Sequence, residues 1–412
     1  MPGATLTINP AQPALTVVRK TTVTENEVKG SLKEMQAAEE RRAYGEAKMA
    51  IDQKYMEIGG ETGLPTDMTQ RATGEGWLRH YKNGVIYFRP GHAAYWVHGA
   101  ILGKYLALGE TASFLGYPTT DELGAPGGVG RYNHFQHGSI YWSPATGAAA
   151  VSGPIRDHWA ELGWETSWLG YPLSDEGVYP EGGRVSAFQK GAIYWWPDTG
   201  PRALNDIVVQ YTGLWCEEET NFDGGVLFMF NYDDEPYTTL GIKGPDLQQT
   251  FDARFYQDVD SGDTRFDVLD LYRGKPRELM VTAVLNEHSG GNPQGVRQLI
   301  EDAYDKGTPY VADAITQIPY VGPVLGPAAR VGFIAAKGDV LDAVNSFIDV
   351  TLGGGDRPLG SDVIALTTKD LILIATRPEG NAYKYEIPWR FSTQPLERQG
   401  AKYWLYFNVF PA

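Results

Sequence analysis

LGYPTTD at Leu115–Asp121 and LGYPLSD at Leu169–Asp175 are the two stretches that decide the fold. Each is followed by a glycine-rich loop and then by an aromatic segment, HGSIYW at His137–Trp142 and KGAIYWW at Lys190–Trp196. The two copies start 54 residues apart (169 − 115). A fixed period of this size marks repeated supersecondary units, each too small to bury a core alone.

A third, degenerate copy lies upstream, with GLPTD at Gly63–Asp67 and NGVIYF at Asn83–Phe88. The segments that join the units also match, VHGAI at Val97–Ile101 with VSGPI at Val151–Ile155. Glycine in the LGYP stretches permits backbone conformations closed to other residues, and the alternating I-Y-W segments are typical of strands. The array is therefore predicted to alternate a short helix, a Gly/Pro turn and an aromatic hairpin.

These motifs resemble the LGFP repeat family over residues 51–204, because the L-G-x-P turn and the G-x-I-Y-W hairpin recur in register. The resemblance implies a non-catalytic module that attaches to cell-wall polysaccharide, found mainly in actinobacterial cell-surface and secreted proteins. The first copy departs from the family pattern, with Thr62 in place of the leucine of the turn and Leu64 in place of its aromatic residue. The resemblance therefore gives no ground to expect that the first repeat binds polysaccharide.

The chain has 412 residues, a net charge of −16 and a pI of about 4.9. Nucleic acid is an unfavourable partner for such an acidic chain, because binding its phosphates needs a basic surface. One cysteine, Cys216, excludes intrachain disulfides and multi-cysteine zinc sites. Residues 1–25 lack the basic start and apolar run of a secretory signal. We expect an extracellular or cell-surface location without a visible signal peptide.

We predict an α+β, mainly β chain in three parts. They are an N-terminal arm and helix at 1–50, the repeat domain at 51–204, and an antiparallel β-sandwich at 205–412 with a helical insert at 296–352. Leu371–Ala375 is among the predicted strands. Within the insert, residues 310–336 are apolar and contain three prolines, which predicts a helix–turn–helix. That segment either contacts membranes or covers one face of the sandwich.

The N-terminal helix is predicted over residues 26–50. Its small and apolar residues fall on one stripe at helical spacing: Leu32, Met35, Ala43, Ala47 and Ala50. The stripe either packs on the first repeat or binds a partner helix.

Aromatic rings of the repeats are candidates for stacking on sugar rings, because a flat apolar ring with a polar edge suits a sugar face. Carboxylates near the turns would accept hydrogen bonds from sugar hydroxyls. The predicted glycan-binding residues are Tyr141, Trp142, Tyr194, Trp195, Trp196, Asp121 and Asp175, with Glu122 and Glu176 as acidic neighbours. The alternative is that these rings form the cores of small repeats.

Acidic loops in the second half could supply the oxygen ligands that Ca²⁺ prefers. The residues that would contribute are Asp233, Asp234, Asp258, Asp260, Asp263 and Asp356. Asp356 is included as a ligand because residues 354–364 faintly resemble calcium- and lipid-binding β-sandwich domains. The alternative is a set of solvated acidic loops, and no other cofactor is expected.

The sequence contains no G-x-S-x-G elbow, phosphate loop or dinucleotide fingerprint. The leading hypothesis is therefore non-enzymatic attachment to surface polysaccharide through the repeats. One alternative is a secreted or injected toxin whose helical insert acts on membranes and whose repeats target glycans. A second alternative is a structural subunit of a surface or phage-like assembly.

Overall fold

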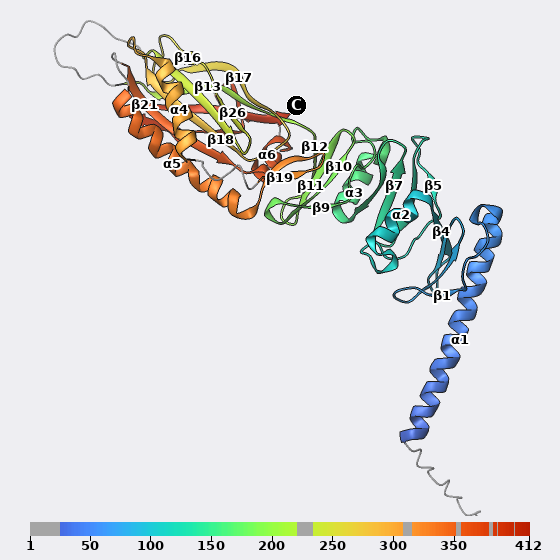
Figure 1. Ribbon diagram of the computed structural model, residues 1–412. Helices are drawn as coiled ribbons and strands as arrows, with labels where there is room; N and C mark the ends of the chain where they lie inside the picture. The colour runs from blue at the N-terminus through green and yellow to red at the C-terminus, as the bar shows by residue number, and fades with distance from the viewer. Residues whose placement is uncertain are drawn as a thin grey trace, which may run out of the picture. The chain divides into compact units, whose positions relative to one another are not determined.

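The computed structural model describes residues 25–220, 234–307, 315–351, 356–378, 382–384, 386–398 and 400–412 (Figure 1). Contacts divide the chain into two compact units. The first runs to Lys82 and includes Ile86–Ala94, and the second holds Asn83–Val85 with Tyr95–Ala412. The fold is mainly β with six helices among the described residues, which confirms the predicted α+β class.

The first unit is built on helix α1 (Glu25–Ile58) and the strand pair β1 (Gln70–Arg71) and β2 (Trp77–Tyr81). Ala47 and Ile51 are buried, whereas Leu32 and Met35 are 50% and 68% exposed. The C-terminal half of the predicted stripe thus packs on the first repeat, and its N-terminal half faces solvent. β3 (Gly84–Phe88) and β4 (Ala94–His98) follow along the chain.

The end of α1 is the helix of the first repeat, since IDQKYMEIG from Ile51 has the spacing of ILGKYLALG from Ile101. In each repeat an aromatic residue of this helix packs on the aromatic residue before the hairpin turn. The ring centroids are 5.0 Å apart for Tyr55–Tyr81, 4.6 Å for Tyr105–Phe135 and 5.2 Å for Trp159–Phe188. One aromatic pair therefore holds helix to hairpin in all three repeats.

The second and third repeats each form a four-stranded antiparallel sheet in chain order, accompanied by one helix (Figure 1). The elements of the second repeat are α2 (Gly99–Leu108), β5 (Leu123–Gly124), β6 (Arg131–Phe135), β7 (Gly138–Ser143) and β8 (Gly147–Ser152). Those of the third are α3 (Gly153–Leu162), β9 (Gly177–Tyr179), β10 (Gly183–Phe188), β11 (Gly191–Trp196) and β12 (Gly200–Leu204). This alternation confirms the predicted unit.

The LGYP turn closes onto the hairpin turn through a glutamine. Gly116 has a φ of +68°, and a Cβ there would lie 2.5 Å from Gln136 Oε1. That oxygen accepts the backbone N–H of Tyr117 at 2.8 Å. Gly170 and Gln189 repeat the arrangement. Glycine is required at Gly116 for two reasons: its φ is positive, and the glutamine side chain lies too close to leave room for a Cβ.

The C-terminal part is a sandwich of two antiparallel sheets. Their orders are β17-β13-β26-β24, with β25 on β26, and β15-β14-β18-β21, with β16 on β14. The strands are β13 (Ile207–Glu218), β14 (Pro236–Gly244), β15 (Leu247–Thr250), β16 (Arg254–Phe255), β17 (Thr264–Gly274), β18 (Leu279–Glu287), β21 (Arg357–Leu366), β24 (Phe391–Ser392), β25 (Leu396–Arg398) and β26 (Ala401–Pro411). A short hairpin of β22 (Ala382–Lys384) and β23 (Ile387–Trp389) precedes β24.

Helices α4 (Pro293–Gly307) and α5 (Pro327–Thr351) lie side by side against the second sheet (Figure 1). β18 is buried on both faces because it lies between two cores. Val281 and Leu285 belong to the core shared with the first sheet, while Met280 and Val284 pack under the helices. The predicted sandwich with a helical insert is therefore present.

Two predictions in this part were wrong. The segment 315–325 forms a β-hairpin, β19 (Ile315–Ile318) and β20 (Gly322–Leu325), in place of a helix–turn–helix, while residues 310–314 lie outside the described ranges. Pro319 with Tyr320 at φ +64° makes the turn, and Pro327 starts α5 at the first helical position, where its missing N–H is not needed.

The predicted strand Leu371–Ala375 is part of helix α6 (Thr368–Ala375). A capping box starts this helix, because Thr367 Oγ1 accepts the N–H of Asp370 and the Asp370 carboxylate accepts the N–H of Thr367. An apolar run of five residues is compatible with a buried strand or a buried helix. The capping box in front of the run is the sequence signal that favours the helix.

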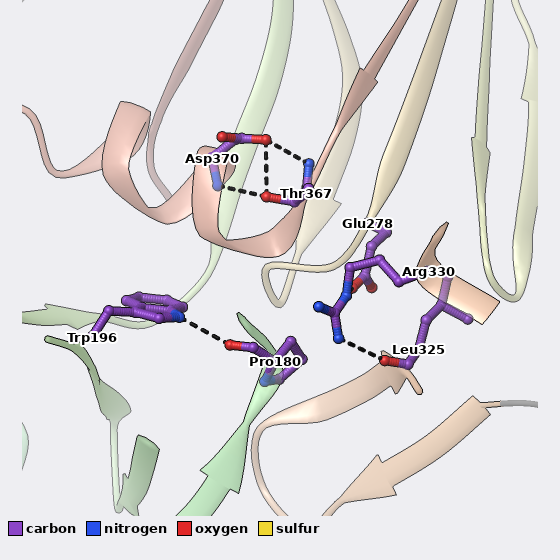
Figure 2. A network of polar contacts seen from close by, with 7 residues as sticks. All are labelled: Pro180, Trp196, Glu278, Leu325, Arg330, Thr367 and Asp370. Carbon is purple, nitrogen blue, oxygen red and sulfur yellow. Dashed lines mark hydrogen bonds and ion pairs between the residues drawn. The ribbon is translucent and has the colours of Figure 1, made fainter. Parts of the chain in front are cut away.

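One hydrophobic core runs across position 204, the predicted boundary between the repeat domain and the sandwich. Tyr179, Tyr194 and Trp196 of the third repeat share a cluster with Leu371 and Ile372 of α6. Figure 2 shows polar contacts around this junction, including Trp196 Nε1 donating to the Pro180 carbonyl at 2.9 Å. The sandwich therefore covers the C-terminal end of the repeat array, as a cap does in repeat proteins.

Candidate functional site

A cavity of about 250 Å³ lies where the end of β4 and the first turn of α2 meet the hairpin of the second repeat. We call it junction site 1. It is lined by His98, Gly99, Ala100, Ile101, Glu122, Arg131 and Trp142. Arg131 and Trp142 are directly opposed on β6 and β7, so their side chains project from the same face of the sheet.

The Glu122 carboxylate lies at the centre of junction site 1. Its Oε2 is 3.4 Å from His98 Nε2, and its Oε1 is 3.6 Å from Arg131 Nε. Burial raises the pKa of Glu122 above its ordinary value, and the neighbouring His98 and Arg131 oppose that shift. The site combines an acceptor, donors and an aromatic ring.

The same constellation recurs one repeat later, and we call it junction site 2. Its members are Ser152, Gly153, Pro154, Ile155, Glu176, Arg184 and Trp195, each at the position of its counterpart in junction site 1. Arg184 again opposes Trp195, here on β10 and β11. Arg184 Nη1 lies 3.4 Å from Glu176 Oε1, and Ser152 Oγ donates to Glu176 Oε2 at 3.3 Å. Burial raises the pKa of Glu176 as well, opposed by Arg184 and by the Ser152 hydrogen bond.

A model of the LGFP repeat matches residues 63–113, 115–167 and 169–214. Residues 63–214 are three LGFP repeats. The third LGFP match runs past residue 204 into β13, in keeping with the hydrophobic core that the third repeat shares with the sandwich. No curated protein matches the chain.

The rings predicted to bind glycan divide into two groups. Tyr141, Tyr194 and Trp196 are 3%, 0% and 0% exposed, so a sugar cannot reach them in this structure. Tyr141 lies in the core of the second and third repeats, and the other two lie in the core shared with the sandwich. Trp142 and Trp195 are half-buried and keep part of their rings accessible. β11 is covered on both faces. Tyr194 lies in the core shared with the sandwich, whereas Ile193 and Trp195 lie on the other face, where Trp195 packs partly buried against the core of the second and third repeats.

The predicted carboxylates Asp121 and Asp175 join successive LGFP repeats. Asp121 Oδ1 accepts the backbone N–H of Trp96, and Asp175 Oδ1 accepts that of Ala150, both at 2.8 Å. Asp175 Oδ2 also lies 2.9 Å from Lys104 Nζ. These hydrogen bonds give the two aspartates structural roles, and Glu122 and Glu176 beside them occupy the junction sites.

Sequence reasoning did not assign roles to Arg131, Arg184, His98 or Ser152. The signal was available, since Arg131 and Arg184 are 53 residues apart, as are Trp142 and Trp195. An arginine and a tryptophan that recur at the same spacing in two repeats indicate that both repeats present the same surface. Comparison of the repeats could not identify His98 and Ser152, because these two equivalent positions hold different residue types.

The acidic residues proposed as calcium ligands are distributed over separate contacts. Asp234 accepts the Tyr403 hydroxyl at 2.7 Å and the Thr220 N–H at 3.0 Å, and Asp356 accepts the N–H groups of Ser289 and Gly291, each at 2.7 Å. Within the described ranges, no three His, Cys, Asp or Glu residues are grouped as a metal site.

The remaining predicted calcium ligands lie in or near one loop. Asp263 pairs with Arg265 at 2.8 Å and accepts the N–H of Asp260 at 3.2 Å. Asp258 contacts Arg265 through its carbonyl oxygen, and Asp233 lies outside the described residues. Calcium binding stays a prediction.

The apolar segment 310–336, predicted either to contact membranes or to cover the sandwich, contributes side chains to the protein interior. Val324 and Leu325 of β20 and Phe333 of α5 are buried. Among the described helices, none has the length and apolar character needed to cross a bilayer. Membrane contact through residues 310–336 stays a prediction.

Proposed function

We propose that this chain binds a surface polysaccharide without catalysing a reaction, through junction sites 1 and 2. The observation that carries the proposal is the recurrence of a carboxylate, a guanidinium and an accessible indole in successive LGFP repeats. A sugar needs these groups: hydrogen-bond acceptors and donors for its hydroxyls and an aromatic face for its ring. The resemblance to cell-wall attachment modules makes an actinobacterial cell-wall glycan, met at the cell surface, the leading ligand.

The charges favour a neutral glycan. Each glutamate already faces an arginine, so a ligand without charge finds both donors and acceptors and leaves no ion unpaired. The net charge of −16 disfavours the approach of an acidic polymer. A uronic acid or phosphate polymer is therefore expected to bind more weakly than a neutral one.

A binding role also fits the number of carboxylates. Glycoside hydrolysis uses two carboxyl groups that flank one sugar bond. The described lining of junction site 1 includes one, Glu122. The neighbouring Asp121 carboxylate is hydrogen-bonded to the backbone of Trp96.

The test is a pull-down of the full chain with purified actinobacterial cell walls. We expect the intact chain to bind and the Trp142→Ala plus Trp195→Ala double variant to lose binding while keeping its circular dichroism spectrum. Trp168→Ala is the matched control, because Trp168 is a 46% exposed tryptophan of the third repeat that lies outside both sites. Equal retention of all three proteins on the walls would refute the proposal.

A further inference from the structure

We infer that junction sites 1 and 2 bind two segments of the same polysaccharide chain at once, and that the ligand is a repetitive polymer recognised through avidity. This inference rests on the proposed function. It adds the class of ligand and the way in which affinity arises.

The two junction sites are closely similar. Glutamate, arginine and tryptophan are identical in both, and the arginine–glutamate distances are 3.6 and 3.4 Å. The residues that differ, His98 against Ser152 and Ala100 against Pro154, belong to the linker. Two sites with the same recognition groups are suited to the same chemical unit. A ligand that presents this unit repeatedly is a polymer.

The cavity of junction site 1 is small. Junction site 1 holds about 250 Å³. Pockets that bury drug-sized ligands hold about 300–1,000 Å³. A smaller cavity buries little of a ligand and gives weak binding to an isolated sugar. Linking two weak sites through one ligand raises the overall affinity by roughly 10²–10⁴, provided that the geometry allows both to be occupied.

Contacts between the second and third repeats hold the two sites in a fixed relation. Both lie in the second unit. Asp175 ties the turn of the third repeat to the backbone of Ala150 and to Lys104 of α2. Tyr141 and Trp159 pack with Phe188 in one hydrophobic cluster that spans the two repeats. A rigid spacing reduces the entropy lost when the second site binds.

The first repeat does not add a third copy of the constellation. Trp77 stands where Arg131 and Arg184 stand in the later repeats, and Tyr44 of α1 packs against its ring with centroids 5.4 Å apart. Phe88, at the position of Trp142, is 3% exposed. We therefore expect two binding segments from the LGFP array.

The experiment measures the affinity of the full chain for purified actinobacterial cell-wall polysaccharide, intact and after hydrolysis to short oligosaccharides. The proteins are the intact chain, Trp142→Ala, Trp195→Ala, the double variant and Trp168→Ala. We expect the intact chain to bind the polymer at least 10-fold more tightly, per sugar unit, than the short fragments. Each single variant should lose this gain and bind polymer and fragments alike, and the double variant should bind neither.

The inference would be overturned if the intact chain bound polymer and fragments with equal affinity and each single variant only halved the number of sites. The proposed function would still stand in that case. Failure of the intact chain to bind either form would overturn both. Glu122→Gln and Glu176→Gln provide a second pair of variants in which the rings stay in place, so that a folding defect of an alanine variant does not decide the result.

Discussion

Asp175 of the third repeat accepts the backbone N–H of Ala150 in the second repeat at 2.8 Å, and Ala150 is fully buried. Removing the carboxylate by Asp175→Ala leaves that N–H without its acceptor and frees Lys104 from its partner. We expect a loss of about 1–3 kcal/mol in the free energy of unfolding. Urea denaturation followed by circular dichroism measures it. Asp157→Ala, at a carboxylate that is 70% exposed, is the control, and an equal effect of both variants would contradict a joining role for Asp175.

Gly116→Ala separates backbone strain from close packing. Gly116 and Gly147 have φ angles of +68° and +71°, but a Cβ at Gly147 meets no atom within 4 Å. Both substitutions incur the left-handed penalty of roughly 1–2 kcal/mol. Gly116→Ala must also displace Gln136 from Tyr117, which adds about 1 kcal/mol. Thermal unfolding of the two variants is the measurement, and identical melting temperatures would show that Gln136 moves aside without cost.

The ion pair of Arg330 and Glu278 is buried beside the junction of the third repeat and the sandwich (Figure 2), with a separation of 3.2 Å between Nε and Oε1. Arg330→Met leaves the Glu278 charge unpaired in the interior and is expected to lower the unfolding free energy by about 3–5 kcal/mol. The Arg330→Met plus Glu278→Gln double variant should recover much of this loss. If it recovers nothing, the arginine acts through its hydrogen bond to the Leu325 carbonyl.

The same pair predicts a pH dependence. Burial raises the pKa of Glu278, and Arg330 opposes that shift. Without the arginine the pKa rises further, so the folded Arg330→Met protein retains a proton that the unfolded chain has released. A carboxyl group with a raised pKa favours folding at low pH and loses that contribution as pH rises. Arg330→Met should therefore approach the stability of the intact chain near pH 5 and depart from it near pH 8.

His134 gives the opposite dependence. Burial and the neighbouring Arg156 lower the pKa of His134 to about 4. Arg156 Nε donates to Ser139 Oγ at 2.7 Å, and the Ser139 hydroxyl lies 2.7 Å from His134 Nδ1, where it can donate to a neutral ring. The unfolded chain binds a proton near the ordinary pKa of about 6.5. The stability that neutral His134 contributes is therefore present above pH 6.5 and is lost as pH falls toward 4.

The measurement for His134 is the unfolding free energy of the intact chain minus that of His134→Gln, taken at several pH values, because other titrating groups cancel in the difference. We expect this difference to fall by on the order of 1–2 kcal/mol between pH 7 and pH 4, after allowance for the partial exposure of the ring. A difference that stays constant over this range would mean that the imidazole titrates normally in the folded protein.

The sequence was sufficient to predict the LGFP repeats because their signals are local. Gly116, Pro118 and the alternating strand around Tyr141 impose the same geometry in each copy. The shared core at Trp196 could not be predicted, since it depends on α6 more than 170 residues later. Short apolar runs such as Leu371–Ala375 are ambiguous until a capping box such as that of Thr367 and Asp370 is recognised.

The candidate site was predictable in part. The position of Trp142 in its hairpin identified an aromatic residue on the repeats, but the sequence could not say which ring of the I-Y-W strand stays partly exposed. Glu122 was visible as an acidic neighbour. Its contacts with His98 and Arg131 depend on how one repeat docks on the linker before it, which is a tertiary relationship.

The most direct test of the central claim is nuclear magnetic resonance of the indole N–H groups in the full chain, labelled at tryptophan, during titration with short oligosaccharides from actinobacterial cell-wall polysaccharide. We predict that the signals of Trp142 and Trp195, assigned by single substitutions to phenylalanine, shift together as sugar is added. The buried Trp159 and the exposed Trp168 serve as references and should not move. Shifts confined to other tryptophans, or the absence of any shift while the oligosaccharide binds, would contradict the assignment of the two junction sites.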